Sequence, residues 1–129
     1  MINNQYIDVG VASKLGKYSD AVLVAEGRRW LYTSGTPGLN ADGSLPPDFE
    51  TQARIAWKSV IAMLDAADMD VGDIVKLTQS LTRRSDLDAY RAIRNAHLGE
   101  ARPASMLTFV SGLLMPDMLI ELEVVAARR

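Results

Sequence analysis

The stretch from Asp48 to about Asp68 constrains the fold more than any other part of the chain. Apolar residues recur there at helical spacing and charged residues fall on the opposite side, which predicts an amphipathic helix with Asp48 as its N-cap. Such a helix is stable only when its apolar side is covered, so we expect it to lie on a sheet. Its apolar positions are Phe49, Ala53, Ala56, Trp57, Val60, Ile61, Leu64 and Ala67.

The segments before this helix are short and rich in strand-forming residues. We expect strands at Gln5–Val9, Asp20–Glu26 and Arg29–Ser34. A short turn that contains Gly27 separates the last two, which favours a hairpin between them. Residues 35–47 are rich in glycine and proline and are predicted to form a loop.

A strand, a second helix and two further strands are predicted after the first helix. Alternation in the first of these strands places Ile74 on the face opposite Leu77. The second helix is predicted to begin after Ser85, with Asp88 in the capping-box position, and to end at Gly99. The three strands are Ile74–Thr82, Met106–Ser111 and Met118–Ala126, and the apolar stripe of the helix is Leu87, Tyr90, Ile93 and Leu98.

The element order is therefore β-β-β-α-β-α-β-β within one domain that covers residues 1–129. Clustered strands with two helices predict an α+β protein in which both helices cover one face of a mixed sheet. On the last strand, Glu121 and Glu123 share one face, while the apolar residues beside and between them take the other. Two interpretations of these glutamates stay open: a solvated outer face of the sheet, or a carboxylate that positions a water molecule in a cleft between subunits.

Charge and composition narrow the classes of function. The formal net charge is −2 and the arginine pairs are scattered, so no nucleic-acid partner is expected. The chain has no cysteine, which excludes disulfides, thiolate catalysis and cysteine metal sites and fits a cytoplasmic location. The start of the chain lacks the features of a signal peptide, and no stretch has the roughly 18 apolar residues of a membrane span. The single histidine, His97, is expected to be a solvated or half-buried helix residue rather than a catalytic base or zinc ligand.

Several blocks of sequence occur in a familiar order. They are GKYSDAVLV, LYTSGTPG, the segment 48–82, DLDAYRAIRNAHLGEARPAS and the terminal LIELEVVA. Together they resemble the RidA/YjgF family over nearly the whole chain, from about Gly16 to Arg129. The resemblance implies a chorismate-mutase-like α+β fold. It also implies a homotrimer with its sheets packed into a central barrel, its helices outside and its ligand clefts between subunits.

The same resemblance implies an activity. Active members of the family hydrolyse reactive enamines and imines, such as 2-aminoacrylate, to 2-keto acids and ammonia. It implies no metal and no organic cofactor, and its expected partners are a small-molecule substrate and the other subunits of the trimer. Residue by residue, Tyr18 matches the family's cleft tyrosine, and Ser34 and Gly35 match the Ser-Gly pair whose backbone lines the cleft. Glu121 matches the glutamate that positions the attacking water.

One position departs from the family's pattern. Active deaminases have the sequence Pro-Ala-Arg at this point, and the arginine binds the substrate carboxylate. This chain has Pro-Ala-Ser instead, with Ser105 in place of the arginine. A small difference in length leaves Met106 as the alternative equivalent, and neither residue has the charge or the two-pronged donor of a guanidinium. Either the substrate lacks the carboxylate, or another cation binds it, for which Arg91 and Arg102 are the candidates.

Two hypotheses of function follow from this departure. The first is a cofactor-independent hydrolase that acts on C–N bonds of a substrate other than 2-aminoacrylate. The second is a non-catalytic trimer that binds a small metabolite or a partner protein.

Overall fold

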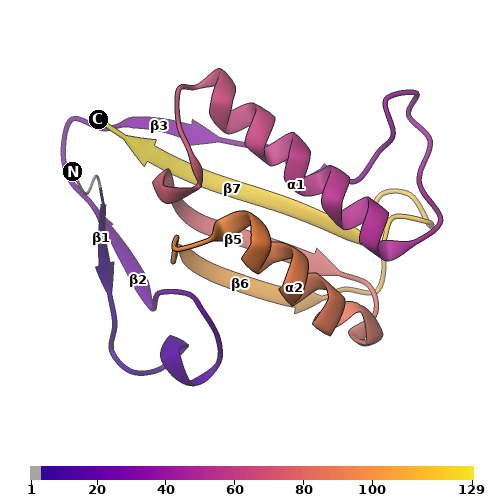
Figure 1. The fold of residues 1–129 in the computed structure, drawn as a ribbon, viewed down its shortest axis with the longest axis horizontal. Helices are drawn as coiled ribbons and strands as arrows, with labels where there is room; N and C mark the ends of the chain where they lie inside the picture. Colours follow the sequence, from indigo (N-terminus) through magenta and orange to yellow (C-terminus); the bar gives the residue numbers. More distant parts are fainter. Residues whose placement is uncertain (1–3) are drawn as a thin grey trace.

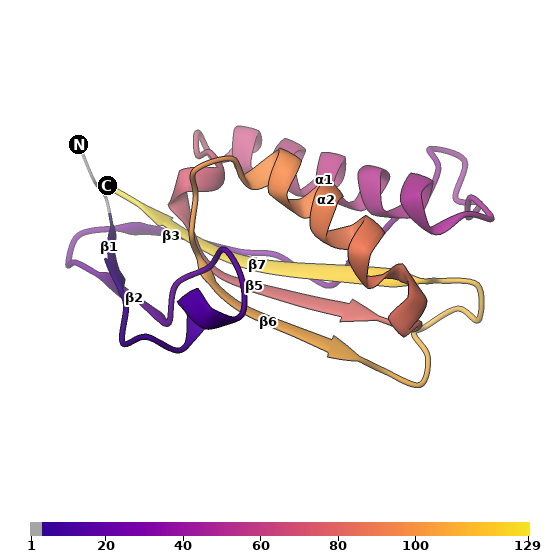
Figure 2. The same ribbon diagram turned by 60° about the horizontal axis from the view of Figure 1, so that its bottom comes forward.

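The protein is a two-layer α+β structure, seen in a computed structural model that describes residues 4–129. The helices α1 (Phe49–Ala66) and α2 (Leu87–Leu98) lie on one face of a five-stranded sheet, and the opposite face is left uncovered (Figures 1 and 2). This arrangement confirms the predicted fold class. Among residues 4–129, no helix has the length and apolar character needed to cross a bilayer.

The sheet is mixed. Strand β6 runs parallel to β5, and β7 runs antiparallel to all three of its partners. A separate two-stranded antiparallel sheet is formed by β1 and β2. In spatial order the main sheet is β3 (Arg29–Tyr32), β7 (Ile120–Arg128), β5 (Ile74–Leu81) and β6 (Ala104–Phe109), with β4 (Thr36–Pro37) also on β7. The remaining elements are β1 (Asn4–Ile7), β2 (Ala21–Val24) and short 3-10 turns at Ala12–Lys14, Val71–Asp73 and Arg84–Asp86.

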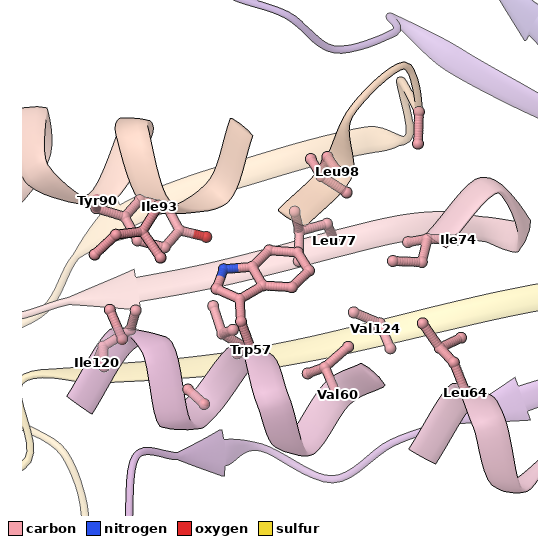
Figure 3. Close-up of a cluster of buried hydrophobic side chains, with 14 of the residues drawn as sticks. Trp57, Val60, Leu64, Ile74, Leu77, Tyr90, Ile93, Leu98, Ile120 and Val124 are labelled. Carbon is pink, nitrogen blue, oxygen red and sulfur yellow. The ribbon is translucent and has the colours of Figure 1, made fainter. Parts of the chain in front are cut away.

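The core lies between the helices and the covered face of the sheet. Figure 3 shows the side chains of α1 packed over β5 and β7, with Trp57 at the centre of the cluster. The predicted cap of α1 is confirmed, because Oδ2 of Asp48 accepts a hydrogen bond from the backbone N–H of Thr51 at 3.0 Å. The fully buried members of the core include Ala53, Ala56, Trp57, Val60, Leu64, Leu77, Ile120, Leu122 and Val124.

The predicted hairpin of the second and third strands is wrong. Strand β2 pairs with β1, and β3 pairs with the C-terminal part of β7, with Arg29 opposite Arg128. In that place Leu31 packs against the core, while Trp30 and Tyr32 lie on the uncovered side. The burial available beside a long central strand therefore outweighs the short turn at Gly27.

Two local predictions are also wrong. Ser85 does not cap α2, because it lies inside the 3-10 turn, and Asp86 precedes the helix without a side-chain cap bond. Ile74 is fully buried on the same side as Leu77, because the pairing of β5 with β7 shifts register between Ile74 and Lys76. Such a bulge inserts one residue and reverses the alternation before it. The predicted end of α2 at Gly99 is confirmed, with φ of +56°.

The loop before α1 is fixed by a buried amide and a close backbone contact. Gln52 is fully buried, and its Nε2 donates to the carbonyl oxygens of Pro46 at 2.8 Å and Asp117 at 2.9 Å. Its Oε1 accepts from the N–H of Leu119 at 2.9 Å. The backbone of Gly38 lies directly against the backbone of Gln52, so a Cβ on Gly38 would be only 2.5 Å from the carbonyl carbon of Gln52. The start of α1 is therefore bound to the segments that enter β4 and β7.

We expect Gly38→Ala to lower the free energy of unfolding by about 1–3 kcal/mol, because the added methyl overlaps backbone that cannot move aside. Urea unfolding measures the change. Gly112→Ala is the matched control, since no atom lies within 4 Å of a Cβ at that position. Equal stability of the two variants would contradict the close contact.

Candidate functional site

A pocket of about 280 Å³ lies between α2, the edge strand β6 and the segment that precedes β2. Three of the residues singled out from the sequence, Tyr18, Arg91 and Ser105, line it together. They come from three separate segments of the chain, so the fold assembles this group. The other lining residues are Leu15, Gly16, Leu87, Arg94, Leu107 and Phe109.

Tyr18 is held beside β6 by its neighbours in sequence. Ser19 forms an isolated parallel bridge with Ala104, and its N–H donates to the carbonyl of Pro103 at 3.1 Å. The carboxylate of Asp20 accepts from the N–H groups of residues 9 and 12 at 2.7 and 2.8 Å, and these bonds lower the pKa of Asp20. The loop that carries Tyr18 is therefore closed at its base and attached to the start of β6.

Ser105 is held from inside the protein by a chain of hydrogen bonds. The hydroxyl of Tyr90 donates to Oε1 of the fully buried Gln79 at 2.6 Å, and burial raises the pKa of Tyr90, which keeps that proton in place. Nε2 of Gln79 then donates to Oγ of Ser105 at 2.8 Å and to the carbonyl of Met106 at 3.1 Å. Because Oγ already accepts a bond, the hydroxyl hydrogen of Ser105 is free to be donated into the pocket.

A second group of predicted residues meets on β7. Pro37 pairs with Glu121, and Thr33 exchanges bonds with Val124, so the segment between them runs along β7. A Cβ on Gly35 would overlap Oε1 of Glu121 and lie 2.7 Å from its Cδ. The carboxylate of Glu121 therefore rests against the backbone of Gly35, next to Ser34, and a side chain at position 35 would displace it.

The two groups lie on opposite faces of the sheet. Glu121 alternates with Ile120 and Leu122, which are fully buried under the helices, so its carboxylate is on the uncovered face. Ser105 bonds to Gln79 and shares a pocket with α2, so its side chain is on the covered face. One copy of the chain therefore does not bring Glu121 to Tyr18 and Ser105.

Arg102 does not line the pocket itself but lies in a neighbouring groove, which Gly16 and Tyr18 also line. Its guanidinium donates from Nη1 to the carbonyls of Gly99 at 2.7 Å and Ala101 at 2.8 Å, and Tyr6 and Lys17 line the same groove. Among the described residues no group of three His, Asp or Glu side chains is placed to hold a metal ion. His97 stacks on Trp57 at 5.5 Å between ring centroids, and its Nδ1 lies 2.9 Å from the carbonyl of Ile93, as expected for a packed helix residue.

Sequence reasoning missed two residues of the pocket region, Gln79 and Arg94. Gln79 occupies a buried position of a strand whose other inward residues are apolar, which is the usual sign of an amide with a structural partner. Arg94 lies seven residues after Leu87 and four after Tyr90, and so on the apolar stripe of α2. A charged residue on that stripe was the signal that could have identified it.

Two helices on one face of a mixed sheet, with a pocket of about 280 Å³ at its edge strand, define a small two-layer α+β protein. Residues 11–128 match the family described as Endoribonuclease L-PSP. The chain belongs to this family, the RidA/YjgF family.

Relatives with known names agree with this assignment. The chain is 35% identical over 103 residues to the 2-iminobutanoate/2-iminopropanoate deaminase of Escherichia coli K12, which covers 77% of this chain and 80% of the relative. Among solved structures, YyfB of the Rid family from Yersinia pestis superimposes with a TM-score of 0.84 at 27% identity, over 96% of this chain and 98% of that one. TdcF of E. coli with bound serine superimposes with a TM-score of 0.72 at 26% identity, over 96% and 94% of the two chains.

We expect Tyr90→Phe to lower the free energy of unfolding by about 1–3 kcal/mol, because it leaves Oε1 of the buried Gln79 without a donor. Tyr32→Phe is the matched control, since that side chain is 71% exposed. Urea unfolding of both variants checks the difference. A change below about 0.5 kcal/mol at Tyr90 would mean that water satisfies the amide instead.

Proposed function

We propose that the chain is the subunit of a cofactor-independent hydrolase that converts reactive imines or enamines of small metabolites to carbonyl compounds and ammonia. The site is a cleft between subunits of a homotrimer. The observation that carries this proposal is the separation of the family's site residues into two groups on opposite faces of the sheet. Each group is complete locally, and a second copy of the chain can bring one against the other.

The uncovered face of the sheet supports an assembly of this kind. Trp30 and Tyr32 stack on it with ring centroids 6.2 Å apart and are 48% and 71% exposed, and Met106 is 53% exposed. Exposed aromatic and methionine side chains on one face are typical of contact surfaces. In a closed ring, the pocket edge of one copy meets the uncovered face of the next, so every copy contributes both groups to different sites.

The residues of the two groups suit the hydrolysis of a C=N bond. Glu121 accepts a proton from a water molecule whose oxygen bonds to the imine carbon, as the imine nitrogen takes up a proton. The resulting carbinolamine loses its C–N bond, which releases ammonia and leaves the carbonyl product. Tyr18 and Ser105 supply hydroxyl donors that orient the substrate for this attack. An enamine enters the same sequence after it tautomerises to the imine.

The substrate is expected to differ from 2-aminoacrylate. The resemblance to the family implies that Ser105, or Met106 as the alternative, stands where active relatives carry the arginine that binds the substrate carboxylate. Neither residue carries a charge, and the hydroxyl of Ser105 is a single neutral donor. Removing a charge-assisted bond of that kind costs roughly 1.5–3 kcal/mol, or about ten- to a hundredfold in affinity. The same substitution favours the alternative function, a trimer that binds a small metabolite without converting it.

We expect Glu121→Gln to reduce ammonia release from freshly generated amino-acid imines by roughly a hundredfold or more, because the amide accepts no proton. Glu123→Gln is the matched control, since Glu123 lies two residues along the same face and is exposed. A coupled assay for ammonia measures the rates. Binding of the product without any ammonia release by the unmodified protein would favour the non-catalytic alternative.

We expect two inactive variants, Glu121→Gln and Tyr18→Ala, to regain activity when they are mixed and allowed to exchange subunits. Random mixing pairs an intact Tyr18 with an intact Glu121 in about a quarter of the sites, so activity should approach about a quarter of the unmodified rate. Native mass spectrometry of the mixture verifies the exchange and counts the subunits. Exchange without recovery would show that both residues act within one copy.

A further inference from the structure

Arg94 is a buried guanidinium at the pocket wall. The residue is 8% exposed, and burial lowers the pKa of its guanidinium. Its Nε bonds to Oδ1 of the adjacent Asn95 at 3.2 Å, and the ring of Tyr90 lies 5.8 Å from its guanidinium carbon. Within residues 4–129 no carboxylate pairs with it. A guanidinium removed from water in this way is costly unless an anion binds to it.

The pocket next to Arg94 offers hydrogen-bond donors. Arg91 and Arg94 both line it, and the charge of Arg91 acts against that of Arg94. The hydroxyl hydrogen of Ser105 is available to donate, since its oxygen is the acceptor in the bond from Gln79. No Asp or Glu is among the described residues that line this pocket. Two like charges held close together with donors around them are stabilised by a shared anion.

Apart from Gly16 and Tyr18, the remaining residues that line the pocket have apolar side chains. They are Leu15, Leu87, Leu107 and Phe109. The guanidinium of Arg84, in the 3-10 turn before α2, lies 4.7 Å from the ring centroid of Phe109. A volume of about 280 Å³ exceeds what a carboxylate alone requires. The ligand that fits both parts carries an anionic end and an apolar side chain.

We infer that this pocket is an anion subsite in which Arg94 and Arg91 bind the carboxylate of a ligand whose branched or aromatic side chain packs against Leu107 and Phe109. The anchoring charge is thus supplied by helix α2 and not by strand β6, where Ser105 contributes a hydroxyl donor. This inference names the substrate class of the proposed hydrolase and rests on that proposal for the catalytic step alone. Equilibrium binding of the ligand needs no hydrolysis.

Titration calorimetry with 4-methyl-2-oxopentanoate, the keto-acid product of a branched substrate, tests the inference directly. We expect it to bind roughly ten- to a hundredfold more tightly than pyruvate, because three more apolar carbons are buried. Its methyl ester lacks the anion and should bind at least tenfold more weakly than the acid. No binding of the acid, or equal binding of acid and ester, would overturn the inference.

The variant Arg94→Met keeps an unbranched, flexible side chain, shorter than that of arginine, and removes the charge. We expect the affinity for 4-methyl-2-oxopentanoate to fall about ten- to a hundredfold. The melting temperature without ligand should stay the same or rise, because an unpaired buried charge is removed. Arg54→Met is the matched control, since Arg54 is an exposed residue of α1 paired with Glu50. Unchanged affinity in Arg94→Met would overturn the inference, whatever the melting temperature. A lower melting temperature in that case would assign Arg94 a structural role.

Ammonia release from the imine of leucine separates this inference from the proposed function. If the unmodified protein binds the keto acid through Arg94 but releases no ammonia, the subsite stands and the hydrolase does not. If ammonia is released equally by the unmodified protein and by Arg94→Met, the hydrolase stands and the subsite is wrong.

Discussion

The alternation of β7 determines most of what the rest of the structure can do. Ile120, Leu122 and Val124 are completely buried under the helices. Because side chains alternate along a strand, this burial places the residues between them on the opposite face. The strand also pairs with three others, so its orientation sets theirs. Glu121 is on the uncovered face as a direct result, opposite the pocket that α2 forms with β6. The proposed site uses residues of both faces, and this is why the proposal requires a second copy of the chain.

Much of the fold follows from local pattern. The period of α1, its cap at Asp48 and the end of α2 at Gly99 depend on residues close together in sequence, and all three were predicted from the sequence. The partner of β3 was not, because it lies almost a hundred residues away in β7 and no local signal names it. The bulge after Ile74 was not predicted either, because it depends on how β5 pairs with the distant strand β7.

The site divides in a similar way. Tyr18, Arg91 and Ser105 were named from the sequence, and the structure places them around one pocket. Arg102 was named with them, but the carbonyls of Gly99 and Ala101 hold its guanidinium in the neighbouring groove, which shares Tyr18 with the pocket. Gln79 and Arg94 were overlooked because a pattern of apolar and polar residues treats a buried amide or guanidinium as an interruption. Such interruptions are where a core gives up packing for a specific polar contact.

Ser105 and Arg94 line the same pocket, so the effect of a substitution at one position depends on the residue at the other. A guanidinium at position 105 would stand in the same pocket as those of Arg91 and Arg94, and the three like charges would repel one another. It would also remove the hydroxyl to which Gln79 donates. The arginine of the helix and the arginine of the strand are therefore alternatives, and a lineage that exchanges one for the other must pass through a protein with both or with neither. The effects of the two substitutions on stability and binding cannot be added.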